Sequence, residues 1–173
     1  MKKILGQRIF LRLLTAADVN PTYLSWLNDP EINRFLETRF TSFSLVKLKE
    51  YVIESNRNQA ERLFGIFLNN GGHIGNVKIG DISAQHKHGA VGILIGDKRL
   101  WGKGFATEAI SLITKYAFNT LRLHKLVAGA LKNNSGSIKA FKKSGFIEVG
   151  IFREHRRQNK KFLDEVLLEI INL

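Results

Sequence analysis

One stretch of the sequence constrains the possible folds of this chain most. An apolar run ends in glycine there, and a Gly-Lys-Gly turn leads from it into a helical pattern. The run VGILIG spans residues 91–96, and DKRLWGKGFATEA follows it at 97–109. Residues 109–118, AISLITKYAF, then repeat apolar side chains at helical spacing. A strand that meets a helix through glycines leaves the unpaired amides of the first helical turn open to an anion. We therefore predict a phosphate-binding loop between a strand and a helix.

Two common phosphate loops do not fit this spacing. A Walker loop has four residues between its first glycine and Gly-Lys, and then needs Ser or Thr. Here five residues separate the glycines at 96 and 102, and another glycine follows the lysine. A dinucleotide fingerprint needs a third glycine where Thr107 stands. The remaining alternative is a turn that only lets strand and helix meet closely. Arg99 and Lys103 favour anion binding because they add positive charge.

Length and composition are typical of one globular domain. With 173 residues and 44% hydrophobic residues the chain can bury a core, so we expect a single domain over residues 1–173. No apolar run reaches the roughly 18 residues of a membrane span, and the basic start MKKILGQRIFLRLL lacks the apolar stretch of an export signal. The absence of cysteine excludes disulfides, thiolate metal sites and a cysteine nucleophile, and favours a cytoplasmic location.

The net charge of +12 narrows the class of partners. Such a field attracts polyanions, which include nucleic acid, an anionic membrane surface and small molecules with several phosphates. The same field repels a polycation such as a polyamine. The alternative interpretation is a solvated basic surface without a specific partner.

Strand and helix patterns alternate in an order typical of a mixed α+β fold. Alternating or buried apolar runs predict strands at 3–14, 62–68, 73–82, 90–96, 126–131, 146–155 and 162–171. Helical spacing and caps predict helices at 21–29, 44–57, 105–119 and 135–144. Gly145 should end the last helix, and Thr15 with Asp18 marks a further helix start. A basic loop is predicted at 156–161. We expect about seven strands and four helices.

Three segments, in order, resemble the GCN5-related N-acetyltransferases. RLWGKGFA at 99–106 is similar to the acetyl-CoA signature of this family, Gln/Arg-x-x-Gly-x-Gly/Ala. NSGS at 134–137 and FKKSGF at 141–146 resemble its Asn-x-x-Ser and Lys-x-Gly-Phe stretches. WLNDPE at 26–31 resembles the start of the subgroup that acetylates ribosomal-protein N-termini, whose relatives include amino-sugar and polyamine acetyltransferases.

This resemblance implies a fold, a cosubstrate and a set of binding residues. The implied fold is a mixed, mostly antiparallel sheet with helices on both faces, split where the fourth and fifth strands diverge. The implied cosubstrate is acetyl-CoA, and no metal is expected. Backbone groups of Ile93, Leu94 and Ile95 would pair with the pantetheine arm. The residues that would hold or flank the pyrophosphate are Arg99, Trp101, Gly102, Lys103, Gly104, Phe105, Ala106 and Thr107.

The resemblance also implies direct attack of an amine on the thioester, without an acyl-enzyme. Many family members protonate the departing thiolate with a tyrosine on the helix after the fifth strand, but Phe141 stands there. Ser137 matches a proposed acid of the ribosomal-type subgroup, and helix capping is its alternative role. Asn134 would contact the pantetheine arm, or else cap the same helix. We assign Ser137 and Asn134 to the catalytic site.

No residue stands out as the general base. Several relatives carry a glutamate before the fourth-strand glycine, where this chain has Val91. The remaining candidates are charged residues that also suit a surface, a turn or an acceptor contact: Asp81, His86, Glu31 and Glu37. For the acceptor site we name Glu31, Arg34 and Asp81. His124, at a junction between helix and strand, suits a structural role.

A site without an obvious strong base suits an amine of low pKa. At pH 7.4, deprotonating a lysine amine costs about 4 kcal/mol, whereas an α-amine costs well under about 1 kcal/mol. A peptide N-terminus and a sugar amine both fit this requirement. The segment WLNDPEINRFLETRF at 26–40 resembles acetyltransferases of nucleotide-linked amino sugars, so we expect such a sugar as acceptor, with a peptide N-terminus as the alternative. Two other classes are a CoA-binding protein without catalysis, suggested by Phe141 and Val91, and a nucleic-acid-binding domain that uses residues 156–161. The sequence leaves a homodimer open.

Overall fold

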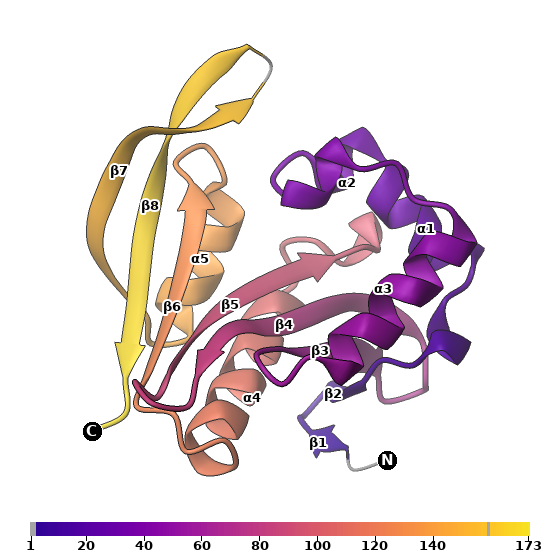
Figure 1. Ribbon diagram of the computed structural model, residues 1–173, viewed down its shortest axis with the longest axis horizontal. Helices are drawn as coiled ribbons and strands as arrows, with labels where there is room; N and C mark the ends of the chain where they lie inside the picture. Colours follow the sequence, from indigo (N-terminus) through magenta and orange to yellow (C-terminus); the bar gives the residue numbers. More distant parts are fainter. Residues whose placement is uncertain (1–2, 159) are drawn as a thin grey trace.

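Eight strands form one sheet in the order β1-β2-β3-β4-β5-β6-β8-β7 (Figure 1). The computed structural model describes residues 3–158 and 160–173. Neighbouring strands are antiparallel except β5 and β6, which run parallel. The strands are β1 (Ile4–Leu5), β2 (Ile9–Leu13), β3 (Arg62–Leu68), β4 (His73–Ser83), β5 (His88–Ile95), β6 (Lys125–Leu131), β7 (Ile147–Gln158) and β8 (Lys161–Ile171).

Helices cover both faces of the sheet. The α-helices are α1 (Pro21–Asn28), α2 (Pro30–Asn33), α3 (Leu45–Arg57), α4 (Phe105–Asn119) and α5 (Ser135–Lys143), and short 3-10 helices lie at η1 (Ala16–Asp18), η2 (Glu37–Phe40) and η3 (Lys98–Leu100). One core lies beneath α4 and α5, and a second lies between α1, α3 and the face of β2 and β3 (Figure 1). In the described residues, none of the helices is both long and apolar enough to cross a bilayer.

The sheet opens between β5 and β6. These strands pair only at His88–Lys125, Gly89–Leu126 and Ala90–Val127. Beyond that point β5 stays paired with β4 up to Ile95, and β6 stays paired with β8 up to Leu131. The two strands separate as they run on (Figure 1). The short β1 adds one strand at the start, so β5 and β6 are the fourth and fifth strands of the expected fold, and the expected split is confirmed.

Most predicted elements are confirmed, and the departures have local causes. The helix at 105–119 and the hairpin of β3 and β4 lie where the sequence predicted them. The predicted strand 3–14 is instead two strands, because the Gly6 amide donates to the Ile9 carbonyl at 2.8 Å and turns the chain. A helix absent from the prediction, α2, follows Asp29, whose side chain accepts from the Glu31 amide at 2.8 Å.

The predicted basic loop at 156–161 was wrong in extent. Arg156, Arg157 and Gln158 continue β7 and pair with Leu163, Phe162 and Lys161 of β8. Residue 159 of this segment lies outside the described residues. The hairpin is therefore longer than expected, and it carries basic side chains along a strand instead of in a loop.

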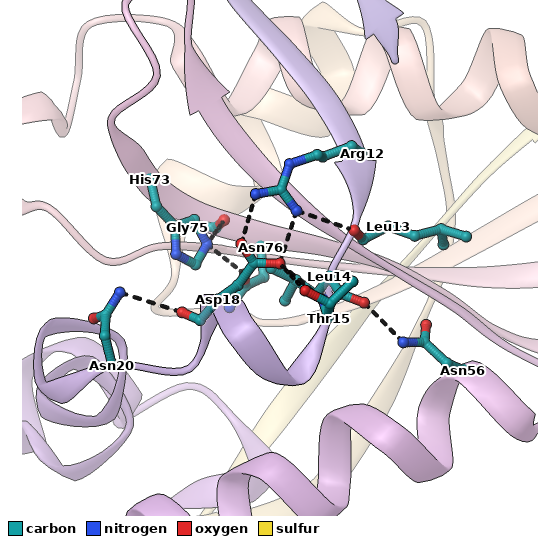
Figure 2. A network of polar contacts seen from close by, with 10 residues as sticks. All are labelled: Arg12, Leu13, Leu14, Thr15, Asp18, Asn20, Asn56, His73, Gly75 and Asn76. Atoms are coloured by element: carbon teal, nitrogen blue, oxygen red, sulfur yellow. Dashed lines mark hydrogen bonds and ion pairs between the residues drawn. The ribbon is translucent and has the colours of Figure 1, made fainter. Parts of the chain in front are cut away.

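A polar network joins η1 to the edge of the sheet (Figure 2). The Arg12 guanidinium donates to Asp18 Oδ1 at 2.5 Å and to Asp18 Oδ2 at 2.7 Å, and the Thr15 amide donates to Oδ2 at 2.8 Å. Burial would raise the pKa of Asp18, but these hydrogen bonds and the Arg12 charge outweigh it and lower the pKa to about 2. Asp18 is therefore an ionised anchor for the start of the helical layer.

An aromatic stack connects this network to the glycine loop. Arg12 lies over the Phe67 ring at 4.2 Å, and Phe67 stacks on His73 with ring centroids 4.8 Å apart. The His73 ring meets Trp26 at 5.0 Å in an edge contact. A Cβ on Gly96 would lie only 2.0 Å from Trp26 Cδ2, so glycine is required where β5 ends. The stack thus fixes the end of β5, where the loop begins.

The Asp18 pKa makes a prediction about acid stability. A carboxyl group whose folded-state pKa is depressed from 3.8 to about 2 stabilises the fold above about pH 4, and this contribution is lost as the pH falls towards 2. Allowing for partial exposure, we expect Asp18→Asn to lower the free energy of unfolding by about 1–2 kcal/mol at pH 7. Urea denaturation at several pH values measures this difference, which should shrink towards pH 2. A difference that does not change with pH would contradict the assignment.

Candidate active site

A cleft of about 590 Å³ lies where β5 and β6 separate. The second half of β5, the loop before α4 with its first turn, and the start of α5 line much of it. From α2, η2 and the segment between them, Glu31, Ile32, residues 34–37 and Arg39 line it as well. β6 and β8 contribute residues 129–131 and Glu165. Segments from both halves of the sequence therefore meet at the split.

The loop before α4 brings a row of backbone amides to the cleft. Gly104 has φ of 82°, a left-handed conformation that glycine adopts without strain, and it caps α4. The Glu108 amide makes the first helical bond, to the Gly104 carbonyl at 3.1 Å. In the part of the chain that the structure describes, the amides of Phe105, Ala106 and Thr107 have no acceptor. Such amides, at the positive end of a helix dipole, bind phosphate groups.

Arg8 holds this loop from behind. Its guanidinium donates to the Lys103 carbonyl at 2.9 Å and to Glu108 Oε2 at 2.8 Å, and its amide donates to Glu108 Oε1 at 2.9 Å. It also lies over the Phe105 ring at 4.4 Å. Burial would raise the pKa of Glu108, but the Arg8 hydrogen bonds outweigh it and lower the pKa. Glu108 therefore stays ionised and ties the first turn of α4 to the residues before β2.

β5 has an open edge on the side of the cleft. Beyond Ala90 the strand has no pairing with β6, and Ile93, Leu94 and Ile95 line the cleft. An open strand edge can bind an extended ligand through its backbone, as another strand would. The indole of Trp101 donates to the Ile95 carbonyl at 2.8 Å. This carbonyl is therefore satisfied within the protein, while the Trp101 ring forms part of the cleft wall.

The start of α5 supplies a polar patch beside an aromatic one. Asn134 caps α5, because its Oδ1 accepts from the Ser137 amide at 3.3 Å. Both side chains line the cleft, and within the described residues the Ser137 hydroxyl has no hydrogen-bond partner. Phe141 is 2% exposed and meets Phe146 edge-on, with centroids 5.0 Å apart. The ring of Phe141 belongs to the core and has no proton to donate.

Charged residues of α2, η2 and the β7–β8 hairpin meet at the cleft. Glu37 Oε1 lies 3.5 Å from Arg39 Nη1 and 3.5 Å from Arg156 Nη1. Gln158 donates to the Arg34 carbonyl at 2.7 Å. Glu31 accepts from Lys98 at 2.6 Å. The contacts of Arg156 and Gln158 join the segment after α2 to the β7–β8 hairpin, and the contact of Glu31 with Lys98 joins α2 to η3.

Four predicted residues lie outside the cleft. Arg99 is paired with Asp97 at 2.8 Å, and Lys103 is exposed at the surface of the loop. Asp81 lies at the irregularity of β4 between Gly80 and Ser83, with φ of 50°. His86 stacks on His88 in the turn that follows. None of the four lines the cleft. For Asp81, the reason is that the β4–β5 hairpin carries it beyond the split.

Glu165 and Arg156 are among the cleft-lining residues that sequence reasoning missed. Glu165 of β8 is 8% exposed, and it accepts from Arg156 Nε at 3.0 Å and from Arg156 Nη2 at 3.3 Å. The bond to Glu165 outweighs desolvation and raises the pKa of Arg156. The available signal was a glutamate within the apolar run FLDEVLLEII. The sequence does not indicate Arg156 as its partner, because a loop is predicted at 156–161.

Comparison with known proteins gives consistent matches. A family profile described as an acetyltransferase (GNAT) domain matches residues 8–147. A probable N-acetyltransferase of Bacillus subtilis is 33% identical over 84% of this chain and 90% of its own. An uncharacterized N-acetyltransferase of Bacillus licheniformis is 26% identical over 99% and 97%. The crystal structure of spermidine N-acetyltransferase from Vibrio cholerae, in complex with CoA and spermine, is 25% identical with a TM-score of 0.85, covering 96% of each chain.

The profile covers most of the chain, and it includes the split sheet and the amide-lined loop described above. The fold is that of the structural neighbours, with a mostly antiparallel sheet and one parallel pair. The chain therefore belongs to the GNAT family of acetyltransferases and is an acetyl-CoA-dependent N-acetyltransferase.

Proposed function

We propose that the enzyme binds acetyl-CoA along β5 and the loop before α4, and transfers its acetyl group to the amine of a nucleotide-linked amino sugar. The observation that carries the first part is that unpaired amides at the start of α4 and the open edge of β5 share one cleft. Phe105, Ala106 and Thr107 would hold the pyrophosphate, and Ile93 and Leu94 the pantetheine arm. Bound acetyl-CoA supplies an acetyl group activated as a thioester.

Ser137 is our candidate for the group that donates a proton to the departing thiolate. Its hydroxyl lines the cleft and has no partner among the residues that the structure describes, whereas the aromatic ring of Phe141 offers no proton. Asn134 fixes the first turn of α5 and so orients Ser137. A thiol of pKa near about 8.5 is a tolerable leaving group, so a weak acid suffices.

The charges of the cleft support an acceptor with one amine on an anionic carrier. Five cationic side chains and three carboxylates line the cleft. Each carboxylate already has a cationic partner: Glu31 has Lys98, while Glu37 and Glu165 share Arg156. A polyamine needs several unpaired carboxylates, and among the described lining residues there are none. The Vibrio cholerae neighbour binds spermine, but this cleft supports a different acceptor class.

A protein N-terminus is the second candidate acceptor. It offers the same low-pKa amine, and the segment at 26–31 resembles the ribosomal-type subgroup. It carries no phosphate, however, and so offers no anion to the Arg34 guanidinium at the cleft. A nucleotide diphosphate would pair with such guanidinium groups in bidentate fashion.

Gly104→Val tests the loop. We expect acetyl-CoA affinity, measured by calorimetry, to fall at least about tenfold, because a β-branched residue is strained at φ of 82° and crowds the amide row. The matched control is Gly71→Val, which has φ of 96° in the β3–β4 turn and open space around it. The control should match wild type in affinity. Equal affinity in all three proteins would remove the loop from the binding site.

Ser137→Ala tests the proton donor. We expect kcat to fall about 10- to 100-fold while the Kd for acetyl-CoA changes less than about twofold, because the hydroxyl acts on the leaving thiolate. Ser137→Thr keeps a hydroxyl and should recover part of the rate. If the alanine variant turns over like wild type, Ser137 is only part of the helix cap.

A panel of acceptors tests the substrate class. Release of CoA is followed with a nucleotide-linked amino sugar, the free amino sugar, an N-terminal peptide and spermidine. We expect the highest kcat/KM for the nucleotide-linked sugar, and we expect added salt to lower it more than that of the free sugar, because the diphosphate is attracted by exposed cations. Preferential turnover of spermidine would refute the charge argument, and preference for the peptide would select the second candidate.

A further inference from the structure

Glu165 is a buried carboxylate on the face of the sheet that α5 leaves open. In β8, Val166 and Leu168 point into the core beneath α5. Because side chains alternate along a strand, Glu165 lies on the opposite face, where α2 and η2 approach the cleft. It pairs in register with Leu131 of β6. Burying a charged side chain on such a face costs free energy, so a structural or chemical role is needed to explain it.

Gly129 makes room for this carboxylate. Gly129 lies on β6 two residues beyond the last pair with β5, at the opening of the split. A Cβ at this position would lie 2.4 Å from Glu165 Oε1 and 3.0 Å from Cδ. Any other residue would displace the carboxylate, since this contact is far below van der Waals distance. The carboxylate of β8 thus reaches across β6 into the wall of the cleft.

The two oxygens of Glu165 are used unequally. Oε2 accepts from Arg156 Nε at 3.0 Å and lies 3.5 Å from His155 Nε2. Among the described residues, Oε1 accepts only from Arg156 Nη2, at 3.3 Å, and it lies over Gly129. A carboxylate oxygen can accept two hydrogen bonds, so Oε1 retains capacity.

The charged groups around Glu165 come from two elements. His155 and Arg156 belong to β7. Glu37 and Arg39 belong to η2, and Glu37 contacts Arg156, which in turn contacts Glu165. β6 faces it with the uncharged Gly129 and Leu131. Arg156 therefore orients the Glu165 carboxylate mainly through Oε2, and leaves Oε1, which lies above Gly129, open to the cleft.

We propose that Glu165 receives the amino group of the acceptor and takes the proton that this amine loses when it attacks the thioester. In that step the N–C bond forms and the C–S bond breaks. An acceptor bound as its ammonium ion first releases one proton to solvent, and the neutral amine then attacks. One proton passes from nitrogen to Glu165, the departing thiolate gains a proton from Ser137 or solvent, and Ser137 regains its proton from solvent. Glu165 later returns its proton to solvent. The inference rests on the proposed function for the site, but it holds for any amine. Since a carboxylate is a weaker base than an alkylamine, it serves low-pKa amines best.

The test compares Glu165→Gln with wild type on two acceptors, the free amino sugar and its nucleotide-linked form, at saturating acetyl-CoA. We expect kcat/KM to fall about 10- to 100-fold at pH 7 for both, as for a lost charge-assisted hydrogen bond. The Kd for acetyl-CoA should stay within about twofold. Glu169→Gln is the matched control, because Glu169 lies on the same face of β8, pairs with Lys125, and lies outside the cleft. It should behave as wild type.

The pH dependence separates recognition of the amine from a structural role. If Glu165 binds the ammonium form, the ratio of the variant KM to the wild-type KM is large at pH 7 and falls towards one near about pH 9.5, where a sugar or α-amine is neutral. A merely structural role gives a ratio that does not change with pH. Should Glu165→Gln not fold, Gly129→Ala keeps the charge but displaces the carboxylate, and the same loss is expected.

The outcomes separate this inference from the proposed function. If wild-type enzyme shows no preference for the nucleotide-linked sugar, the proposed acceptor class is overturned. The role of Glu165 is then still decided by comparing Glu165→Gln with wild type. Equal kcat/KM in wild type, Glu165→Gln and Gly129→Ala overturns the role of Glu165. A KM ratio independent of pH overturns it too. Wild-type enzyme that releases CoA with neither sugar overturns the proposed acceptor class, and Glu165→Gln is then compared with wild type on the N-terminal peptide, where the same loss is expected.

Discussion

The separation of β5 from β6 is the constraint on which the rest of the site depends. Each strand is held along its outer edge, β5 by β4 and β6 by β8, while three residue pairs join them at one end. Backbone groups that would otherwise complete the sheet are thus left for a ligand. The same opening brings α4 and α5 to one cleft, and Gly129 with Glu165 to its wall. Binding and chemistry both follow from a sheet that is left incomplete.

The structure around the opening keeps it fixed. Arg8 ties the carbonyl of the glycine loop and the Glu108 carboxylate to the residues before β2. On the other side, the ion pair of Arg12 with Asp18 and the aromatic stack through His73 seat Trp26 against Gly96. These charged groups are paired, and Glu108, Arg12 and Asp18 are largely shielded from water, whereas Arg8 is half exposed. The ligand therefore meets a preorganised row of amides, and little ordering is needed on binding.

Local patterns were predictable from the sequence, and long-range pairings were not. The helix at 105–119 and the left-handed Gly145 depend on neighbours in the chain, and both are confirmed. The break at Gly6–Arg8 is a local turn closed by the Gly6–Ile9 hydrogen bond, which the alternating pattern does not record. Arg156, in contrast, lies in a strand because β8 lies beside it. Asp81 looked suitable by residue type but lies away from the cleft. Glu165 reaches the site only through the space above Gly129, which no local pattern records.

Hydrogen–deuterium exchange with and without CoA tests the central claim most directly, because it reports on the backbone amides themselves. We expect CoA to slow exchange in peptides covering residues 102–107 and 92–95. In the described residues, the first range contains the amides of Phe105, Ala106 and Thr107, which have no protein acceptor, and the second lies on the open edge of β5. Peptides from α3, on the far side of the second core, should exchange as before. Protection confined to other segments, with residues 102–107 unchanged, would contradict the assignment of the open sheet and its loop as the CoA site.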